Sequence, residues 1–285
     1  MGGSLGLALK ARRPGLCVAG YARRAESRGR AIRRGVVDEV FETPASAVAR
    51  ADLVILCTPI LSMPELLKEA LPGLAPGSLV SDVGSTKAWL AETLPAGLQG
   101  TGAAFIGSHP IAGSEQQGLD AARPDLYEGA AVILTPVPAT PASPVEALRA
   151  FWEAVGGRVH VMTPARHDEI MARTSHLPHL AAAALAAVVG RGGNPRVWGP
   201  FCGTGFADST RIAEGSPEVW HDILRTNAGP VREECRALAS EMEKLSGLME
   251  RGQFDIIRQF LEETRERRRA LLQERGGDNR GQENT

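Results

Sequence analysis

Up to residue 162, short apolar runs alternate with stretches in which apolar residues recur at helical spacing. The apolar runs predict strands at 16–21, 52–58, 78–83, 103–108, 130–135 and 158–163. Amphipathic segments such as 63–71 and 144–155 lie between them and predict helices. Short, continuously apolar strands that alternate with helices are typical of a parallel sheet covered on both faces. We therefore predict a Rossmann-like, doubly wound parallel sheet for this part of the chain.

After Pro164 the pattern changes to long helical repeats. These repeats predict helices at 165–190, 217–227, 230–250 and 253–273. Helices of this length with wide apolar faces usually pack as a bundle, often across a dimer axis. The sequence thus predicts three parts: an α/β domain at 1–163, an all-α domain at 164–275, and a disordered tail at 276–285.

The composition favours a globular protein without a strongly charged binding surface. Hydrophobic residues make up 43% of the chain, and 32 Lys and Arg face 33 Asp and Glu, a net charge of -1. No global field would attract nucleic acid or an anionic membrane, and the longest apolar run, 180–189, is too short to span a bilayer. The four cysteines lack the paired spacing of a metal site. We expect a cytoplasmic protein that binds neither nucleic acid nor membrane.

The first residues are typical of the end of a glycine-rich phosphate turn. Gly2, Gly3 and Ser4 lead into a predicted helix, whose first amides would face a pyrophosphate, although a glycine pair at a chain start can also simply be flexible. The strand predicted at 52–58 runs into Thr58 and Pro59. Because ligands bind at the carboxyl ends of parallel strands, we expect this loop to line a dinucleotide.

The strand predicted at 16–21 ends without the acidic residue that usually binds the ribose hydroxyls of NAD. Ala22, Arg23 and Arg24 follow it instead. Two guanidiniums could bind a 2′-phosphate, so we expect the protein to tolerate NADP or to prefer it over NAD. The alternative is that both arginines only solvate the start of a helix.

Three residues are candidates for chemistry at the substrate. His109 follows a predicted strand, and an imidazole that titrates near neutrality suits proton transfer there. Ser85 follows the neighbouring strand and could bond the imidazole or a substrate hydroxyl, or cap the following helix. Arg211 could bind a substrate carboxylate or form a structural ion pair.

The helix predicted at 165–190 carries two further candidate site residues, Ser175 and His179. Ser175 and His179 are four residues apart and share one face of a regular helix. Pro178 removes a backbone hydrogen bond and should open the helix near Thr174, as suits a position where a ligand binds. His176 and His179 lack the spacing and the third ligand of a zinc site, so we expect no metal.

Three motifs together resemble the prephenate/arogenate dehydrogenase family of tyrosine biosynthesis. They are GSHPIAGSE at 107–115, SHLPH at 175–179 and FADSTRIAEGSPEVW at 206–220. The resemblance extends from residue 2 to about residue 271. It implies a dinucleotide-binding domain, a helical dimerisation domain and a homodimer. It also implies oxidative decarboxylation of prephenate or arogenate with NAD or NADP, and the sequence does not choose between these substrates.

The resemblance also implies roles for individual residues. His109 would accept a hydrogen bond from the ring hydroxyl and assist its deprotonation, and Ser85 would orient both groups near the nicotinamide. The remaining positions match the substrate pocket (Ser175, His179, Trp220), the arginine that binds a substrate carboxylate (Arg211) and the loop beside the nicotinamide (Thr58, Pro59).

The N-terminus departs from the family pattern. Met1 and Gly2 align with the end of the phosphate turn, so the first strand and two glycines are expected to be missing, with two neighbouring sheet edges left unpaired. A start further upstream explains this better than a true truncation. Two other functions remain open: another dehydrogenase with a helical second domain, such as a hydroxyacid dehydrogenase or an imine reductase, and a non-catalytic dimeric remnant.

Overall fold

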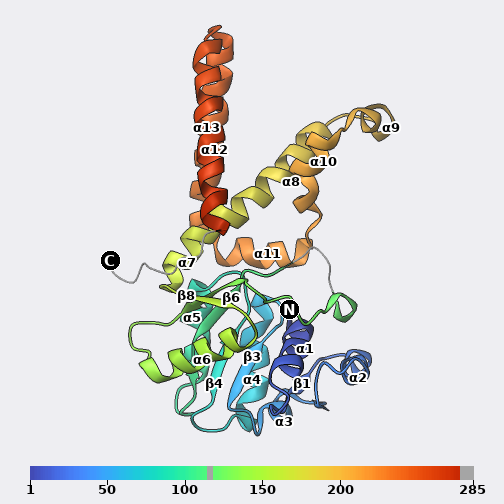
Figure 1. Cartoon of the computed structure of the whole chain (residues 1–285), viewed down its shortest axis with the longest axis vertical. Helices are drawn as coiled ribbons and strands as arrows, with labels where there is room; N and C mark the ends of the chain where they lie inside the picture. The colour runs from blue at the N-terminus through green and yellow to red at the C-terminus, as the bar shows by residue number, and fades with distance from the viewer. Residues whose placement is uncertain (114–117, 277–285) are drawn as a thin grey trace. The chain divides into compact units, whose positions relative to one another are not determined.

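The computed structural model describes residues 1–113 and 118–276 (Figure 1). Ser114 and Glu115 of the GSHPIAGSE motif, and the predicted tail from residue 277 onwards, lie outside the described residues. The chain divides into two compact units, Met1–Arg232 and Glu233–Thr285.

Strands and helices alternate in the first part of the chain. The helices are α1 (Gly2–Arg12), α2 (Ala25–Arg33), α3 (Pro44–Val48), α4 (Met63–Ala70), α5 (Ala88–Gly97) and α6 (Ala142–Ala154), with 3-10 turns η1 (Ile60–Ser62), η2 (Leu71–Gly73) and η3 (Leu119–Ala121). The strands are β1 (Ala19–Tyr21), β2 (Glu39–Phe41), β3 (Leu53–Leu56), β4 (Leu79–Asp82), β5 (Ala104–Phe105), β6 (Gly107–Pro110), β7 (Ala131–Thr135) and β8 (Arg158–Val161).

The strands pair in three groups: β1 with β2, β3 with β4 and β5, and β6 with β7 and β8. The second and third groups are continuous through one extended segment, 104–110, because β5 pairs with β4 while β6 pairs with β7. Between them, the Ile106 amide donates to the Val80 carbonyl. Within the described residues, β1 and β3 form no ladder, so the sheet is split where the sequence predicted two unpaired edges.

Two features of the sheet differ from the prediction. β6 and β7 are antiparallel, whereas the other pairs are parallel. A parallel return needs a crossover, usually a helix, and the described part of the segment between β6 and β7 contains only the short turn η3. The sequence also missed β2, whose three residues are too short and too polar for a recognisable apolar run.

Helices cover both faces of the sheet, as predicted for a doubly wound fold. Leu79 packs in one cluster with side chains of α1 and α6, and the next residue, Val80, packs in another with side chains of α4 and α5. Successive strand residues point to opposite faces, so this single step places β4 between two layers of helix. Trp152 and Leu90, one from each layer, are fully buried.

None of the described residues after Pro164 lies in a strand. In the first unit the elements are α7 (Pro164–Met171), the π-helical segment η4 (Ala172–His176), α8 (Leu177–Val189), α9 (Pro195–Trp198), η5 (Gly199–Phe201), α10 (Thr204–Thr210), η6 (Arg211–Glu214) and α11 (Pro217–Thr226). Helix α12 (Ala228–Glu250) continues into the second unit, which also contains α13 (Phe254–Gly276). The helix predicted at 165–190 is therefore interrupted at η4, and the opening expected near Thr174 is confirmed.

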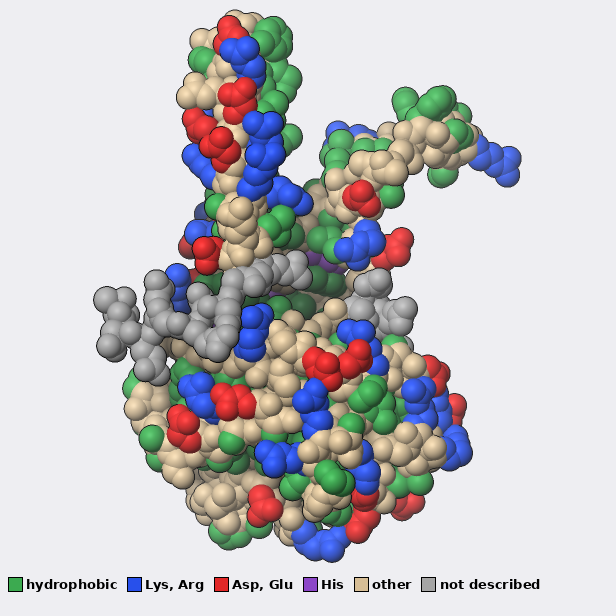
Figure 2. All heavy atoms as spheres, in the orientation of Figure 1, with side chains coloured by type: hydrophobic (Ala, Val, Ile, Leu, Met, Phe, Trp, Pro, Cys, Tyr) green, Lys and Arg blue, Asp and Glu red, His purple; other side chains and the backbone are tan. Residues whose placement is uncertain are grey.

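On the face shown in Figure 2, basic and acidic side chains are interspersed over the strand-containing part of the chain. None of the described helices is both long enough and apolar enough to cross a membrane. The described residues also contain no group of three or more His, Cys, Asp or Glu side chains that could hold a metal ion. The four cysteines are free thiols.

Candidate active site

Helix α7 places two buried polar side chains beside the loop that follows β4. The hydroxyl of Thr163 accepts the amide of Arg166, and Pro164 occupies the first helical position, so local capping fixes where the helix begins. His167 and Asp168 follow and are only 0% and 2% exposed. Neither residue is among the site residues predicted from the sequence.

The Asp168 carboxylate caps the N-terminus of α5. Its Oδ1 accepts the amide of Lys87 at 2.7 Å and its Oδ2 accepts the amide of Ala88 at 2.9 Å. A negative charge is favourable at this end of a helix. No residue of α5 or its own N-cap supplies a capping side chain, so Ser85, half-buried in the preceding loop, does not cap this helix.

His109 lies on β6, half-buried, against the imidazole of His167. Nδ1 of His109 is 2.8 Å from Nε2 of His167, and the ring centroids are 5.0 Å apart in an edge-on arrangement. On the other side of His167, Nδ1 is 2.8 Å from Oδ1 of Asp168. None of the described residues forms a hydrogen bond with Nε2 of His109.

A fully buried ion pair lies under this cluster. Nζ of Lys87 is 2.5 Å from Oδ2 of Asp82, and both side chains are 0% exposed. Asp82 also accepts the amides of Gly84, at 2.7 Å, and Ser108, at 3.2 Å. Since Asp82 ends β4 and Ser108 precedes His109 on β6, the pair fixes the backbone that carries His109.

Burial holds the histidines of the cluster in their neutral form. It lowers the pKa of His109 well below its usual range, and the nearby His167 and Lys87 lower it further. Burial also lowers the pKa of His167, although Asp168 opposes this shift. For the Lys87 and Asp82 pair, burial lowers the pKa of the lysine and raises the pKa of the carboxyl, and each partner's charge opposes the other's shift.

A second cluster forms around Trp220 of α11. The imidazole of His179 stacks on its indole, with ring centroids 3.5 Å apart and planes 13° apart, and His176 meets it edge-on at 5.9 Å. His179 also forms a hydrogen bond with the backbone of Ile212. At Gly215 a Cβ atom would lie 2.5 Å from Nε1 of Trp220, so glycine allows η6 to end against this stack. The structure thus brings together His179 and Trp220, two of the predicted pocket residues.

Two other predicted pocket residues lie on neighbouring segments. Arg211 is the exposed first residue of η6, and η6 packs against α8, the helix that carries His179. Ser175 is exposed within η4, whereas His179 is buried. The π turn changes the helical spacing between these two residues.

Hydrogen bonds join α11 and α7 to the strand-containing part of the same unit. The amide of Leu61, in η1, donates to Oδ2 of Asp222 at 3.1 Å. At the end of α11, Nδ2 of Asn227 donates to the Asp168 carbonyl at 2.8 Å. These contacts set α11 beside the loop that follows β3 and beside α7.

The predicted cofactor residues lie around the start of α1. This helix begins at Gly2 without a side-chain cap, so its first amides can receive a ligand. A Cβ atom at Gly3 would lie 2.7 Å from Leu119, so a larger residue would disturb the loop there. The Ser4 hydroxyl accepts the amide of Arg123. Oγ1 of Thr58 is buried and has no hydrogen-bond partner among residues 1–113 and 118–276, as expected of a group that completes its bonding with a ligand.

At the end of β1, Arg23 and Arg24 are exposed in the turn that leads into α2. The guanidinium of Arg28 donates to the carbonyls of Ala22 and Arg23, which fixes the shape of this turn.

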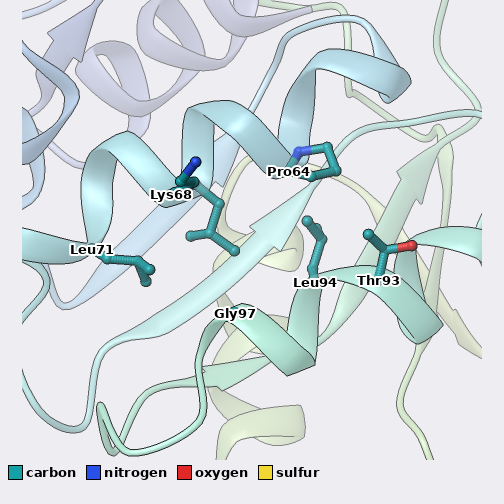
Figure 3. A pocket seen from close by; sticks show the side chains of 7 residues that line it. Pro64, Lys68, Leu71, Thr93, Leu94 and Gly97 are labelled. Atoms are coloured by element: carbon teal, nitrogen blue, oxygen red, sulfur yellow. The ribbon is translucent and has the colours of Figure 1, made fainter.

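A shallow apolar depression of about 190 Å³ lies between α4 and α5 (Figure 3). It is lined by Leu67, Leu71, Leu94 and their neighbours, with Lys68 at the side. It contains none of the residues predicted for the site.

Two family models match the chain. The nucleotide-binding domain of prephenate dehydrogenase matches residues 5–161, and the dimerization domain of prephenate dehydrogenase matches residues 163–263. A cyclohexadienyl dehydrogenase from Zymomonas mobilis is 32% identical over 274 residues, which cover 95% of this chain and 92% of the relative. A prephenate dehydrogenase from Bacillus subtilis is 32% identical over 284 residues, which cover 97% of this chain and 75% of the relative.

Solved structures give the same result. A prephenate dehydrogenase from Aquifex aeolicus in complex with hydroxyphenyl propionate and NAD+ has a TM-score of 0.88 at 31% identity, over 94% of each chain. An arogenate dehydrogenase from Synechocystis has a TM-score of 0.80 at 30% identity, over 94% of this chain and 95% of the other. A 3-hydroxyisobutyrate dehydrogenase from Salmonella typhimurium, at 15% identity, shares only the fold. This chain belongs to the prephenate dehydrogenase family of NAD-dependent oxidoreductases.

Proposed function

We propose that the chain oxidises and decarboxylates prephenate or arogenate, with His109 as the group that receives the ring hydroxyl proton. The observation that carries this proposal is the bonding of His109: Nδ1 faces His167, and Nε2 has no partner among the described residues. A neutral imidazole is required to accept a proton, and burial in this site keeps it neutral.

The reaction needs little more than orientation and one proton acceptor. The carbon that bears the hydroxyl loses a hydride as the hydroxyl proton passes to Nε2 of His109, so this carbon becomes a carbonyl. The bond from the ring to its carboxylate then breaks and CO2 leaves. The electron pair of that bond completes the aromatic ring and leaves a negative charge on the ring oxygen, which takes the proton back from Nε2. Bound NAD or NADP would supply the acceptor of the hydride.

We assign the second cluster and its neighbours to the substrate. Trp220 and His179 form one stacked wall, on which the substrate ring would lie. Arg211 would bind a substrate carboxylate, Ser175 would supply a further polar contact, and Ser85 would orient the hydroxyl toward His109. One relative is named a prephenate dehydrogenase and another an arogenate dehydrogenase. These substrates differ only in their side chain, so the choice between them depends on contacts to that side chain.

We assign the cofactor to the amides of Gly2, Gly3 and Ser4, with Thr58 and Pro59 beside the nicotinamide. Such a ligand fits the uncapped start of α1 and the hydroxyl of Thr58, which is buried without a partner in the part of the chain that the structure describes. For the ribose end we propose a preference for NADP, because Arg23 and Arg24 are exposed where an acidic residue would favour NAD.

We further propose that residues 1–163 bind the cofactor and residues 164–275 form the substrate and dimerisation domain. The family model that matches residues 163–263 is a dimerization domain, which supports a homodimer.

The test is steady-state kinetics by NADH or NADPH absorbance, with both substrates and both cofactors. Wild-type protein is expected to turn over at least one substrate and to bind NADP more tightly than NAD. His109→Asn should lower kcat by about 100- to 10,000-fold with little change in KM. His160→Asn, on exposed β8, is the matched control and should not change kcat. Near-native turnover by His109→Asn would show that His109 is not the base, and a preference for NAD would contradict the role of the arginines.

A further inference from the structure

Three buried or half-buried polar side chains form a hydrogen-bonded row that ends at the proposed base. Oδ1 of Asp168 is 2.8 Å from Nδ1 of His167, and Nε2 of His167 is 2.8 Å from Nδ1 of His109. A neutral imidazole carries one N–H donor and one acceptor nitrogen, so the two rings cannot choose their tautomers independently.

The direction of the protons follows from the carboxylate end of the row. Both oxygens of Asp168 accept backbone amides, from Lys87 and Ala88, so the carboxylate is the acceptor for His167 as well. Nδ1 of His167 must then carry the hydrogen, and its Nε2 is an acceptor. The bond to His109 therefore requires a hydrogen on Nδ1 of His109, which leaves Nε2 of His109 with a free lone pair.

We infer that Asp168 and His167 are positioning residues that hold His109 as its Nδ1–H tautomer, with the Nε2 lone pair presented to the substrate hydroxyl. This inference rests on the proposed role of His109 as the base. It assigns a function to two residues of α7 that lie 58 or more positions further along the chain.

The row is held rigidly enough to fix an orientation as well as a tautomer. His167 is fully buried and Asp168 is 2% exposed. The side chain of Asp168 is fixed by two amides of α5, and its carbonyl accepts Nδ2 of Asn227 at 2.8 Å. A carboxylate bonded on both oxygens cannot rotate without losing a bond to the helix start. The imidazole of His109 is thus anchored through His167 to two helices.

The other charged groups around the row favour the same arrangement. Lys87 is bonded to Asp82, so its ammonium is neutralised there rather than at Asp168. The ammonium of Lys87 and the ring of His176 both disfavour a positive charge on His109 before the reaction. When Nε2 takes up the hydroxyl proton, the new charge on His109 is stabilised by the bond from its Nδ1–H to His167, with the Asp168 carboxylate behind it.

Two substitutions of His167 separate the two bonds of the row. In His167→Gln, the side-chain oxygen can reach the position of Nε2 and accept from His109, but the bond to Asp168 is lost. In His167→Asn, the amide nitrogen can take the place of Nδ1 and donate to Asp168, but the bond to His109 is lost. His167→Phe keeps the ring shape and removes both bonds.

We expect kcat to fall by about 10- to 100-fold in His167→Asn and His167→Phe, with KM for the substrate within about threefold of wild type. His167→Gln should retain more activity than either, because it keeps an acceptor for Nδ1–H of His109. Thermal unfolding of each variant shows whether it is folded. Wild-type kcat in folded His167→Phe would overturn the inference, since it would mean that His167 only packs.

The tautomer itself is measured without turnover. In full-length protein labelled with 15N histidine, at pH 8, two-bond 1H–15N spectra distinguish Nδ1–H from Nε2–H, and His109→Asn assigns the signal of His109. We expect Nδ1–H for His109 and for His167. An Nε2–H signal from His109 would overturn the inference even if no His167 variant folds. A correct tautomer together with full activity of His109→Asn would instead contradict the proposed function.

Discussion

The buried pair of Lys87 and Asp82 offers a sharp test of how the site is built. Lys87→Met keeps most of the side-chain volume and removes the ammonium that lies 2.5 Å from Asp82. The carboxylate then keeps only the two amides of Gly84 and Ser108, in a position with 0% exposure. Removing one partner of a buried ion pair typically costs about 3–5 kcal/mol, a large part of the stability of a domain.

The loss of unfolding free energy in Lys87→Met should decrease as the pH falls. Burial already raises the pKa of Asp82, and without Lys87 this shift is no longer opposed. The folded variant would then take up a proton at a pH where the unfolded chain, with an Asp pKa near 3.9, is still ionised. The stability deficit relative to wild type should therefore be largest near pH 8 and smaller near pH 5.

Urea unfolding at pH 8 and pH 5 measures this deficit, and Asp82→Asn combined with Lys87→Met is the matched control, because it removes the unpaired charge. A second readout is the acid limb of the kcat profile, which should move to higher pH, since Lys87 is one of the groups that lowers the pKa of His109. A deficit below about 1 kcal/mol at pH 8, or an equal deficit at both pH values, would refute the reasoning.

Two further substitutions probe the helical side of the site. If the bound substrate excludes water from its ion pair with Arg211, Arg211→Ala should raise KM by about 30- to 1,000-fold, equivalent to about 2–4 kcal/mol, with a smaller effect on kcat. The exposed Arg225→Ala on α11 should change neither KM nor kcat. Burial lowers the pKa of His176 to about 4, below the value near 6.5 expected in the unfolded chain, so the unfolded state binds its proton first as the pH falls. Wild type should lose about 2 kcal/mol of unfolding free energy from this group between pH 7 and pH 5, and His176→Asn, which keeps an acceptor for Asn227, should lack that loss in parallel urea titrations. Identical pH dependence of the two proteins would mean that His176 does not titrate as stated.

The sequence predicted the alternation of strands and helices because buried parallel strands are continuous apolar runs. The run at 52–58 contains β3, and the run at 78–83 contains β4, each a little shorter than predicted. Strand order and direction are not encoded in this pattern. The antiparallel pairing of β6 and β7 depends on the connection between them, and β2 is stabilised by its neighbour β1 rather than by a long apolar sequence of its own.

The sequence also identified the residues that face a ligand more readily than those that support them. His109 and His179 stand in motifs with unusual local chemistry, at a strand end and near a proline within a helix. By contrast, His167 and Asp168 stand among other polar and charged residues in the middle of α7, a pattern typical of an exposed helix face. Only the fold shows that these two side chains are buried and that Asp168 caps a different helix.

The residues that support the site are also linked to one another through hydrogen bonds. Asp82 and Asp168 each bond backbone amides at the end of a secondary-structure element, Asp82 at the end of β4 and Asp168 at the start of α5. Between them, Lys87 donates its side chain to one carboxylate and its backbone amide to the other. The Asp168 carboxylate in turn accepts Nδ1–H of His167, and this bond decides which nitrogen of His109 carries the hydrogen. The chemistry of His109 therefore depends on residues that stabilise the fold, and substitutions that weaken the junction of α5, α7 and β6 should change turnover before they unfold the protein.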